Sequence, residues 1–406
     1  MLRVYEKAKQ IADIRSQFPS LNYAKIHYLD NAATSQTVDT AIKAVSDYHY
    51  NYRSNIHRGE YASAMTASNL YEQAREQVAK LINAKPYEIA FTSGTTDGLN
   101  RIAESIDRDR KVIITELEHH SNIMPWIKAS RGQDQGDLIV VQASDHGDVS
   151  LEDFYTALEY AKPGTFVSIT TQSNLTGLEL KWRDMVQIAK EQGCEVMLDA
   201  CQTIGHKPID VQSSNMDWLV FSGHKMFAST GIGVIFKRGG FHDVELSVGG
   251  GTVQWLNFDK YDLNSDPSRI EAGTPNIAGV HSIGAAAQWI QDTTYKTIAE
   301  CEKEFYNMLK EKGLFAIDDM KLIGPKTFRS VYSFVLKDHD AGDVATLLGM
   351  EDVCVRSGHL CAYPASCRYN PTESGVLRVS LAPYNDENDC VQLVEGLWKI
   401  FKKLNS

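Results

Sequence analysis

A lysine and an aspartate each follow a short apolar run in this chain of 406 residues. Lys225 ends a Ser-Gly-His-Lys sequence directly after the run at 218–221, and Asp199 ends the run at 196–198. Singly, such a lysine is usually a solvated loop residue and such an aspartate is often a helix cap. Pyridoxal phosphate, however, needs a lysine amine for its Schiff base and a buried carboxylate to keep its ring nitrogen protonated. Together, the two residues predict a pyridoxal phosphate site.

Two further segments carry groups that suit the same cofactor. Residues 92–96 read Thr-Ser-Gly-Thr-Thr before a helical pattern, which predicts an anion site at a helix N-terminus or, as an alternative, an ordinary cap. His119 and His120 follow the apolar run at 112–114, so an imidazole at this sheet edge could stack on a ring and move protons. The two histidines do not predict a metal site, because consecutive side chains diverge and no third ligand follows at the usual spacing.

Seven apolar runs that alternate with helical patterns must position these groups. The runs lie at 88–92, 112–114, 138–141, 166–169, 196–198, 218–221 and 232–236. Runs that are apolar at every position are typical of strands buried on both faces, so we predict an α/β fold with a mostly parallel seven-stranded sheet covered by helices. Ligands of such sheets bind at the carboxyl ends of the strands, where Asn174 and Gln202 would add hydrogen-bond donors.

The pattern changes after the Gly-Thr-Pro sequence at 273–275. The remainder of the chain predicts a smaller α+β domain, with helices at 277–312, 344–348 and 385–403 and strands at 331–336, 353–356 and 376–380. The polar segment from 249 to 268 predicts a mobile loop. We therefore predict an N-terminal helical segment at 1–20, a large cofactor-binding domain at 21–275 and a small C-terminal domain at 276–406.

Composition narrows the class of partner. The net charge is −11 with scattered acidic residues, which argues against a nucleic-acid partner and gives no polybasic membrane patch. The seven cysteines are odd in number, widely scattered and form no CxxC pair, which favours a reducing, cytoplasmic location over a disulfide framework or a zinc site. No stretch has the apolar length of an export signal or a membrane span. A small soluble substrate is favoured.

Seven motifs in order resemble those of one enzyme family. They are YLDNAA at 28–33, SNIHRG at 54–59, EHHSN at 118–122, DACQ at 199–202, SGHK at 222–225, EAGTPN at 271–276 and RSGHLCA at 356–362. Together they look like the fold-type I pyridoxal phosphate enzymes of the class V aminotransferase superfamily, and within it the cysteine desulfurases of the SufS type. The resemblance runs from about Tyr28 to the C-terminal helix, and seven ordered motifs are far more specific than any one of them.

The resemblance implies three sets of site residues. The catalytic set is Lys225 as the Schiff-base lysine, Cys361 as the nucleophile and His119 as the imidazole stacked on the ring. The cofactor would be held by Thr95, Asn174, Asp199, Gln202, Ser222, His224, Lys225 and Thr274. The substrate L-cysteine would be held by Asn174, Arg356 and Arg378. A guanidinium fork also suits a carboxylate independently of the family.

Cys361 would decide the reaction. In the family, the equivalent loop cysteine attacks the sulfur of the cysteine–cofactor adduct, keeps it as a persulfide and releases alanine. The nucleophile must be a thiolate, and Arg356 and His359 are near enough in sequence to favour that form. A lone cysteine is otherwise a small buried hydrophobe. Cys367 stays open between a second thiol on the loop and a packing residue.

The resemblance alone also implies partners. Thr274 matches a residue that reaches the other subunit's cofactor phosphate, which implies a homodimer. The compact segment at 358–378 resembles the branch that passes sulfur to an acceptor of the SufE or SufU kind, for iron–sulfur clusters or other sulfur-containing cofactors. Leu360 and Cys201 depart from the family's usual residues. The alternatives are a selenocysteine lyase acting on L-selenocysteine, which would not need the cysteine, and a cofactor-binding regulatory protein without turnover.

Overall fold

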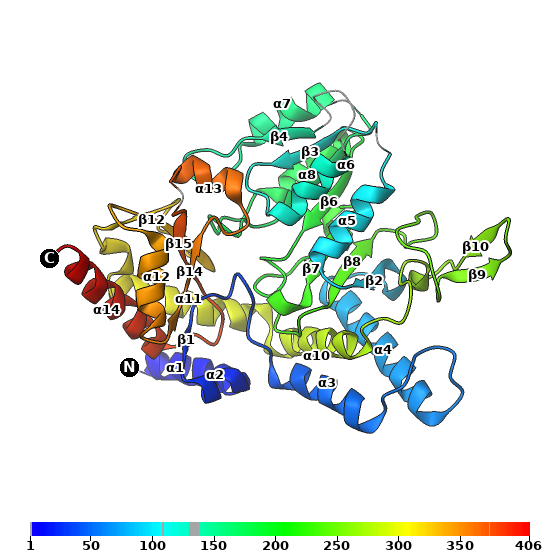
Figure 1. The fold of residues 1–406 in the computed structure, drawn as a ribbon, viewed down its shortest axis with the longest axis horizontal. Helices are drawn as coiled ribbons and strands as arrows, with labels where there is room; N and C mark the ends of the chain where they lie inside the picture. Colours follow the sequence, from blue (N-terminus) through cyan, green and yellow to red (C-terminus); the bar gives the residue numbers. More distant parts are fainter. Residues whose placement is uncertain (1, 108, 130–137, 162, 373) are drawn as a thin grey trace.

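A seven-stranded sheet forms the centre of the molecule (Figure 1). The computed structural model describes residues 2–107, 109–129, 138–161, 163–372 and 374–406. In spatial order the strands are β2 (Ile89–Thr92), β8 (Gly233–Lys237), β7 (Trp218–Ser222), β6 (Glu195–Asp199), β5 (Phe166–Thr170), β3 (Val112–Thr115) and β4 (Leu138–Val141). The strands from β7 to β4 are parallel, while β8 is antiparallel to both of its neighbours. The predicted α/β fold with a mostly parallel sheet is confirmed.

Alternate side chains of the central strands enter two separate apolar layers. On β5 and β6, Val167 and Leu198 belong to one buried cluster, whereas Phe166 and Met197 belong to the other. One layer is covered by α7 (Leu151–Ala161) and α8 (Trp182–Glu191), and the other by α5 (Thr95–Ser105) and α6 (Met124–Ala129). Since successive strand residues point to opposite faces, uniformly apolar strands are what a doubly covered sheet requires.

A layer of long helices lies under the first of these faces. It consists of α3 (Asp39–Asn51), α4 (Ala62–Leu81) and α10 (Ile277–Thr293), and α10 packs closely on both of the others. The predicted single helix from 277 to 312 is wrong, because Thr294 takes a left-handed φ of 71° and divides it into α10 and α11 (Tyr295–Glu311). The Thr294 side chain then caps α11 by accepting from the N–H of Thr297.

A second, antiparallel sheet is formed near the C-terminus. Its order is β11 (Met320–Leu322), β12 (Val331–Leu336), β15 (Val376–Ser380) and β14 (Arg356–Gly358). Buried residues of α11, α12 (Ala341–Gly349) and α14 (Glu387–Leu404) pack with this sheet, whereas those of α1 (Leu2–Arg15) and α2 (Pro19–Ala24) belong to the core of the large sheet. The strand predicted at 353–356 is divided into β13 (Val353–Cys354), which pairs with β1 (His27–Tyr28), and β14. The domain division at 20 and 275 stays a prediction, and α10, just past 275, shares the core of the large sheet.

The segment expected to be a loop at 249–268 contains a β-hairpin. Its strands β9 (Val253–Leu256) and β10 (Tyr261–Leu263) are antiparallel and project from the body of the molecule (Figure 1).

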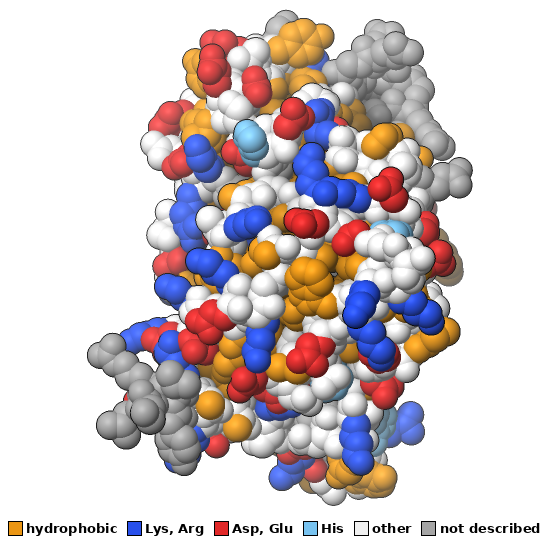
Figure 2. Space-filling model, turned by 90° about the vertical axis from the view of Figure 1, so that its left-hand side faces the viewer, with side chains coloured by type: hydrophobic (Ala, Val, Ile, Leu, Met, Phe, Trp, Pro, Cys, Tyr) orange, Lys and Arg blue, Asp and Glu red, His pale blue; other side chains and the backbone are white. Residues whose placement is uncertain are grey.

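On the side that carries α12 and α14, basic and acidic side chains are interspersed (Figure 2). In the described residues, no helix combines the length and apolar character that a bilayer crossing needs.

Candidate active site

A cavity of about 380 Å³ opens at the carboxyl ends of the parallel strands. It is also lined by the segment that continues from β14, which brings the C-terminal sheet to the same place. The predicted site residues that line it are Thr95, His119, Asn174, Asp199, Gln202, Ser222, His224, Lys225, Arg356, Cys361 and Arg378. Thr274 is the exception among the predicted residues. The carboxyl ends of the parallel strands account for most of these residues, and the C-terminal sheet brings Arg356, Cys361 and Arg378 to the same cavity.

Asp199 and Lys225 leave adjacent strands. Asp199 is the last residue of β6, and Lys225 ends the short 3-10 helix η3 (Gly223–Lys225) after β7. The Asp199 carboxylate is 3% exposed and accepts the N–H of Cys201 at 2.9 Å. Burial raises the pKa of Asp199, against the lowering effects of Cys201 and Lys225. A positively charged group beside this carboxylate would favour its ionised form.

The start of α5 forms the polar end of the cavity. Thr95 is the first residue of α5, and its N–H donates to Ser222 Oγ at 2.9 Å. Strand β8 lies so close that a Cβ on Gly233 would be 2.5 Å from Gly94 Cα, so only glycine fits there. Backbone N–H groups at a helix start, with the hydroxyls of Thr95 and Ser222 beside them, suit an anion such as a phosphate. Burial and the Lys225 charge lower the pKa of His224 to about 4, so its imidazole is a neutral polar group here.

Cys201 and Gln202 complete this side of the cavity. The Cys201 thiol lies 2.8 Å from Thr95 Oγ1, and burial raises its pKa to about 12, so it stays protonated. Gln202 is buried and donates its amide to the carbonyl of Ala32 at 2.9 Å. Cys201, where the chain departs from the usual residue of the family, is thus a thiol that hydrogen-bonds to Thr95 at the polar end of the cavity.

His119 is held as a neutral imidazole. Its Nδ1 accepts the N–H of Ser121 at 3.1 Å, so the ring proton lies on Nε2. Burial, with the Lys225 charge as the next cause, lowers the pKa of His119 to about 3. Near neutral pH, this histidine therefore presents an N–H donor.

A buried carboxylate directly precedes His119 in the chain. Glu118 accepts from Thr115 Oγ1 at 2.6 Å, Asn122 Nδ2 at 2.6 Å and the N–H of Thr170 at 3.0 Å. Burial raises its pKa to about 7 despite these three hydrogen bonds. The network ties the ends of β3 and β5 together behind the cavity. Sequence reasoning missed it, since only the position of Glu118 in the EHHSN motif marked the residue.

Two arginines that line the cavity share one carboxylate. Arg378 is 2% exposed and donates Nη2 to Asp30 Oδ1 at 3.1 Å, while Arg356 Nη2 lies 2.9 Å from Asp30 Oδ2. Burial lowers the pKa of Arg378, and Asp30 opposes that effect. Within the described residues, Arg378 Nε and Asn174 Oδ1 are buried without a hydrogen-bond partner. A ligand with both acceptor and donor groups, such as an amino acid, would satisfy them.

Cys361 lies on a backbone of unusual conformation. Both Leu360 and Cys361 have a φ of 55°, a region that costs non-glycine residues energy. The Leu360 carbonyl accepts Asn174 Nδ2 at 2.7 Å, and the Cys361 side chain is exposed. Of the two groups expected to favour the thiolate, Arg356 pairs with Asp30 and His359 lies 3.0 Å from Ser366 Oγ. Their influence on the thiolate stays a prediction.

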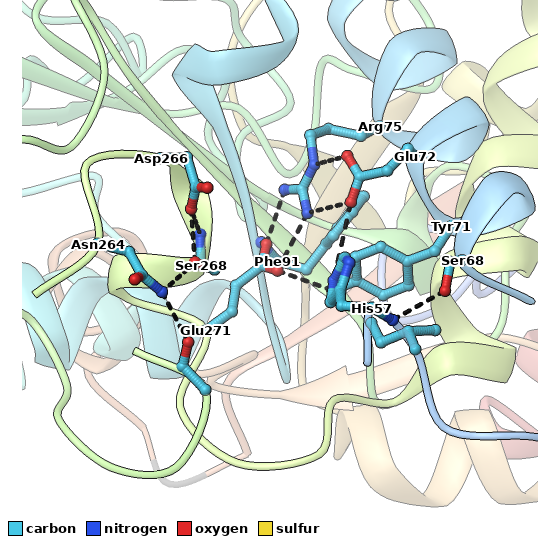
Figure 3. A network of polar contacts seen from close by, with 12 residues as sticks. His57, Ser68, Tyr71, Glu72, Arg75, Phe91, Asn264, Asp266, Ser268 and Glu271 are labelled. Carbon is cyan, nitrogen blue, oxygen red and sulfur yellow. Dashed lines mark hydrogen bonds and ion pairs between the residues drawn. The ribbon is translucent and has the colours of Figure 1, made fainter. Parts of the chain in front are cut away.

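Thr274 lines a second cavity, of about 810 Å³, together with residues 55–59 of the SNIHRG motif. The base of its loop is fixed by Glu271, which pairs with Arg75 at 2.7 Å and accepts the hydroxyl of Tyr71 at 2.9 Å (Figure 3). Both partners of this ion pair are buried and hydrogen-bonded to further neighbours, the arrangement that such pairs require. Within one chain, Thr274 does not join the first cavity, so its predicted role needs a second copy.

The first cavity fits pyridoxal phosphate. A polar end suited to a phosphate, a lysine and a buried carboxylate in need of a positive partner are the groups that this cofactor requires. The unpartnered Asn174 and Arg378 atoms lie on the side left for a substrate.

Known proteins are similar to this chain in sequence and in fold. Residues 27–393 match the family model of the class-V aminotransferases. The chain is 34% identical over 404 residues to a cysteine desulfurase of Synechococcus elongatus, covering 96% of this chain but only 63% of that longer protein. It is 32% identical to a probable cysteine desulfurase of Vibrio cholerae, with 95% and 97% covered. The apo structure of a cysteine desulfurase from Thermococcus onnurineus superposes with a TM-score of 0.89 at 31% identity, covering 97% of this chain and 98% of that one.

Proposed function

The chain belongs to the cysteine desulfurases of the class V aminotransferase family, with their fold-type I architecture, and from this we propose that it converts L-cysteine to L-alanine and keeps the sulfur on Cys361 as a persulfide. The observation that carries the proposal is that Cys361 lines the same cavity as Lys225 and Asp199. A lysine and a carboxylate alone would serve many reactions of the same cofactor, whereas a thiol in reach of the substrate selects this one.

Pyridoxal phosphate would be held from both ends. Thr95, Ser222 and His224 would bind its phosphate, Asp199 its ring nitrogen, and Lys225 its aldehyde carbon. Gln202 would face the ring hydroxyl once its amide turns from Ala32, while Asn174 would contact the cofactor beside the substrate. When bound, the cofactor supplies an aldehyde that condenses with amines and a ring that accepts the electrons left at the substrate Cα.

The residues around the cofactor would bind the substrate and move its protons. Arg378, with Arg356 beside it, would grip the carboxylate of L-cysteine, and Asn174 would fix its orientation. The Lys225 amine would take the Cα proton. His119, neutral with its proton on Nε2, would hold a proton at that atom for delivery to the leaving carbon skeleton.

Cys361 would carry out the sulfur transfer. Its thiolate attacks the substrate sulfur, so that a new S–S bond forms while the substrate Cβ–S bond breaks. The electron pair of the broken bond stays with the three-carbon skeleton, which takes up one proton at Cβ, regains at Cα the proton that Lys225 had taken, and leaves as alanine. The exposure of Cys361 leaves the persulfide open to a later acceptor.

We extend the proposal to a homodimer, in which Thr274 and its loop reach the phosphate of the partner's cofactor. The compact cysteine segment supports membership of the SufS type, with an acceptor of the SufE or SufU kind and delivery to iron–sulfur or other sulfur-containing cofactors. The seven free cysteines support a cytoplasmic location.

The test is to locate the persulfide. After addition of L-cysteine, alkylation of the protein and mass spectrometry of its peptides should find one extra sulfur on Cys361, with alanine formed in step. Extra sulfur on Cys367 instead would overturn the choice of nucleophile. Alanine without any protein persulfide would favour the selenocysteine lyase, which the same measurement with L-selenocysteine then identifies.

A further inference from the structure

His120 contacts the segment at 359–363 that carries Cys361, here called the cysteine loop, at two points. The proposed reaction does not use His120. Its backbone N–H donates to the carbonyl of Cys361 at 2.7 Å. Its side chain Nε2 accepts the N–H of Tyr363 at 3.0 Å. One residue of the large sheet's edge thus holds the loop on both sides of Ala362.

The loop needs such support because its conformation is strained. Leu360 and Cys361 are successive residues with a left-handed φ, and strain of this kind persists only where the surroundings impose it. Beyond the turn from His359 to Ala362, the chain enters α13 (Tyr363–Tyr369). A second anchor is Asn174, whose side-chain amide donates to the carbonyl of Leu360.

The imidazole replaces a missing helix cap. The residue at the N-cap of α13 is Ala362, whose side chain cannot accept a hydrogen bond. The N–H of Tyr363 lies in the first turn of α13, where no intrahelical carbonyl is available. His120 supplies the acceptor from another part of the chain, 243 residues away.

We propose that His120 is a positioning residue for sulfur transfer: by capping α13 it fixes the backbone from which the Cys361 thiol reaches the substrate. The inference rests on the proposed function, because it concerns the same nucleophile. A misplacement of about 1 Å at a reacting group can cost about a hundredfold in rate, so the position of this backbone matters. The role requires an unprotonated Nε2, which places the ring proton on Nδ1.

Two substitutions separate the hydrogen bond from the shape of the side chain. In His120→Gln, the amide oxygen comes close to the place of Nε2 and restores an acceptor. His120→Leu fills similar space without an acceptor. His146→Leu, at an exposed histidine that lines neither of the two cavities, is the matched control.

The first readout needs no turnover. In the holoenzyme, hydrogen exchange of peptides that contain Tyr363 should be faster by about fivefold in His120→Leu, the value of one hydrogen bond, and close to wild type in His120→Gln and His146→Leu. The second readout is kinetic: kcat for alanine release should fall at least as much in His120→Leu, with KM for L-cysteine and the cofactor absorption unchanged, and should recover in His120→Gln.

Unchanged exchange and kcat in His120→Leu would overturn the inference, as would equal losses in His120→Leu and His120→Gln. If His120→Leu does not fold, His120→Asn takes its place, since the shorter amide does not reach the Nε2 position. Altered exchange in a protein that forms no persulfide on Cys361 would support the capping contact while refuting the proposed function, so the two failures are distinguishable.

Discussion

The active site has two halves that are built in opposite ways: a strand-end half with Asp199 and Lys225, and a loop half with Cys361. Asp199 and Lys225 follow strands that are buried and hydrogen-bonded to neighbours on both sides. Cys361, in contrast, is exposed on a strained loop between β14 and α13. Hydrogen bonds from Asn174 and His120 hold that loop against the large sheet.

The difference matches what each half must do. Shifted pKa values, such as those of Asp199 and His119, require burial and fixed neighbours, which strand ends provide. In the proposed function, a thiol that meets a substrate and afterwards an acceptor requires access, which the exposed position of Cys361 provides. In the proposed function, the residues at the strand ends serve the chemistry of the cofactor, and the loop with Cys361 selects among its reactions.

The largest effect should come from Lys225→Ala, on the strand-end half. Without the amine, the cofactor has no covalent link and the Cα proton has no base, so alanine release should fall by at least about a hundredfold. The absorption of the lysine-bound cofactor should vanish as well, as measured by spectrophotometry after reconstitution. A retained band would show that another residue holds the cofactor.

Cys361→Ser should remove the thiol nucleophile of the loop half and leave the strand-end half intact. We expect the cofactor absorption and its response to L-cysteine to stay intact while alanine production from cysteine is lost, because a hydroxyl is a poor nucleophile toward sulfur. Alanine formation from L-cysteine and from L-selenocysteine should be measured side by side. Loss of turnover with L-cysteine alone fits a desulfurase, because cleavage of a carbon–selenium bond does not need the cysteine, whereas unchanged turnover of L-cysteine would make the protein a general lyase. Cys367→Ser is the matched control and should keep both activities.

The sequence predicted the large sheet well, because strands buried on both faces are apolar at every position. The antiparallel direction of β8 also has a signal in the sequence, because too few residues separate it from β7 for a crossover helix. The break at Thr294 and the hairpin of β9 and β10 had no such signal. Apolar periodicity continues across the break, and the hairpin is exposed although it carries apolar side chains such as Trp255 and Phe258.

The strand-end residues of the site could be predicted for a simple reason: the carboxyl ends of parallel strands meet at one edge. The roles of Glu118 and His120 could not, although their motif was noticed. Glu118 acts through Thr170, and His120 acts through Tyr363, and only the folded chain brings these partners together. Periodicity carries no information on such long-range polar contacts.

Arg378→Lys tests the contact between the two halves, since Arg378 lies within β15 of the C-terminal sheet and donates to the carbonyl of Asn174, which follows β5 of the large sheet. Lysine keeps the charge but loses the fork that grips a carboxylate. The loss of one charged hydrogen bond predicts a KM for L-cysteine higher by about tenfold, with a smaller change in kcat. Steady-state kinetics checks this, and an unchanged KM would mean that Arg356 binds the carboxylate alone.

The smallest effect should come from Glu118→Gln, behind the strand-end half. The pKa of Glu118 in the folded protein, about 7, lies above its value in the unfolded chain, so the folded state holds this proton more tightly. The free energy of unfolding should therefore fall as the pH rises through this range, by about 1–3 kcal/mol from this group. Glutamine cannot ionise, so the variant should lack that fall.

Urea unfolding of the holoenzyme at about pH 5 and about pH 8 measures the difference, because the midpoint follows stability. The urea midpoint of Glu118→Gln, relative to that of wild type, should be higher at about pH 8 than at about pH 5. This holds even if the lost hydrogen bonds lower the midpoint of the variant at both pH values. The exposed Glu159→Gln should show no such gain. Parallel shifts in Glu118→Gln would mean that this carboxylate stays ionised throughout, and that the strand-end half tolerates a buried charge beside Asp199.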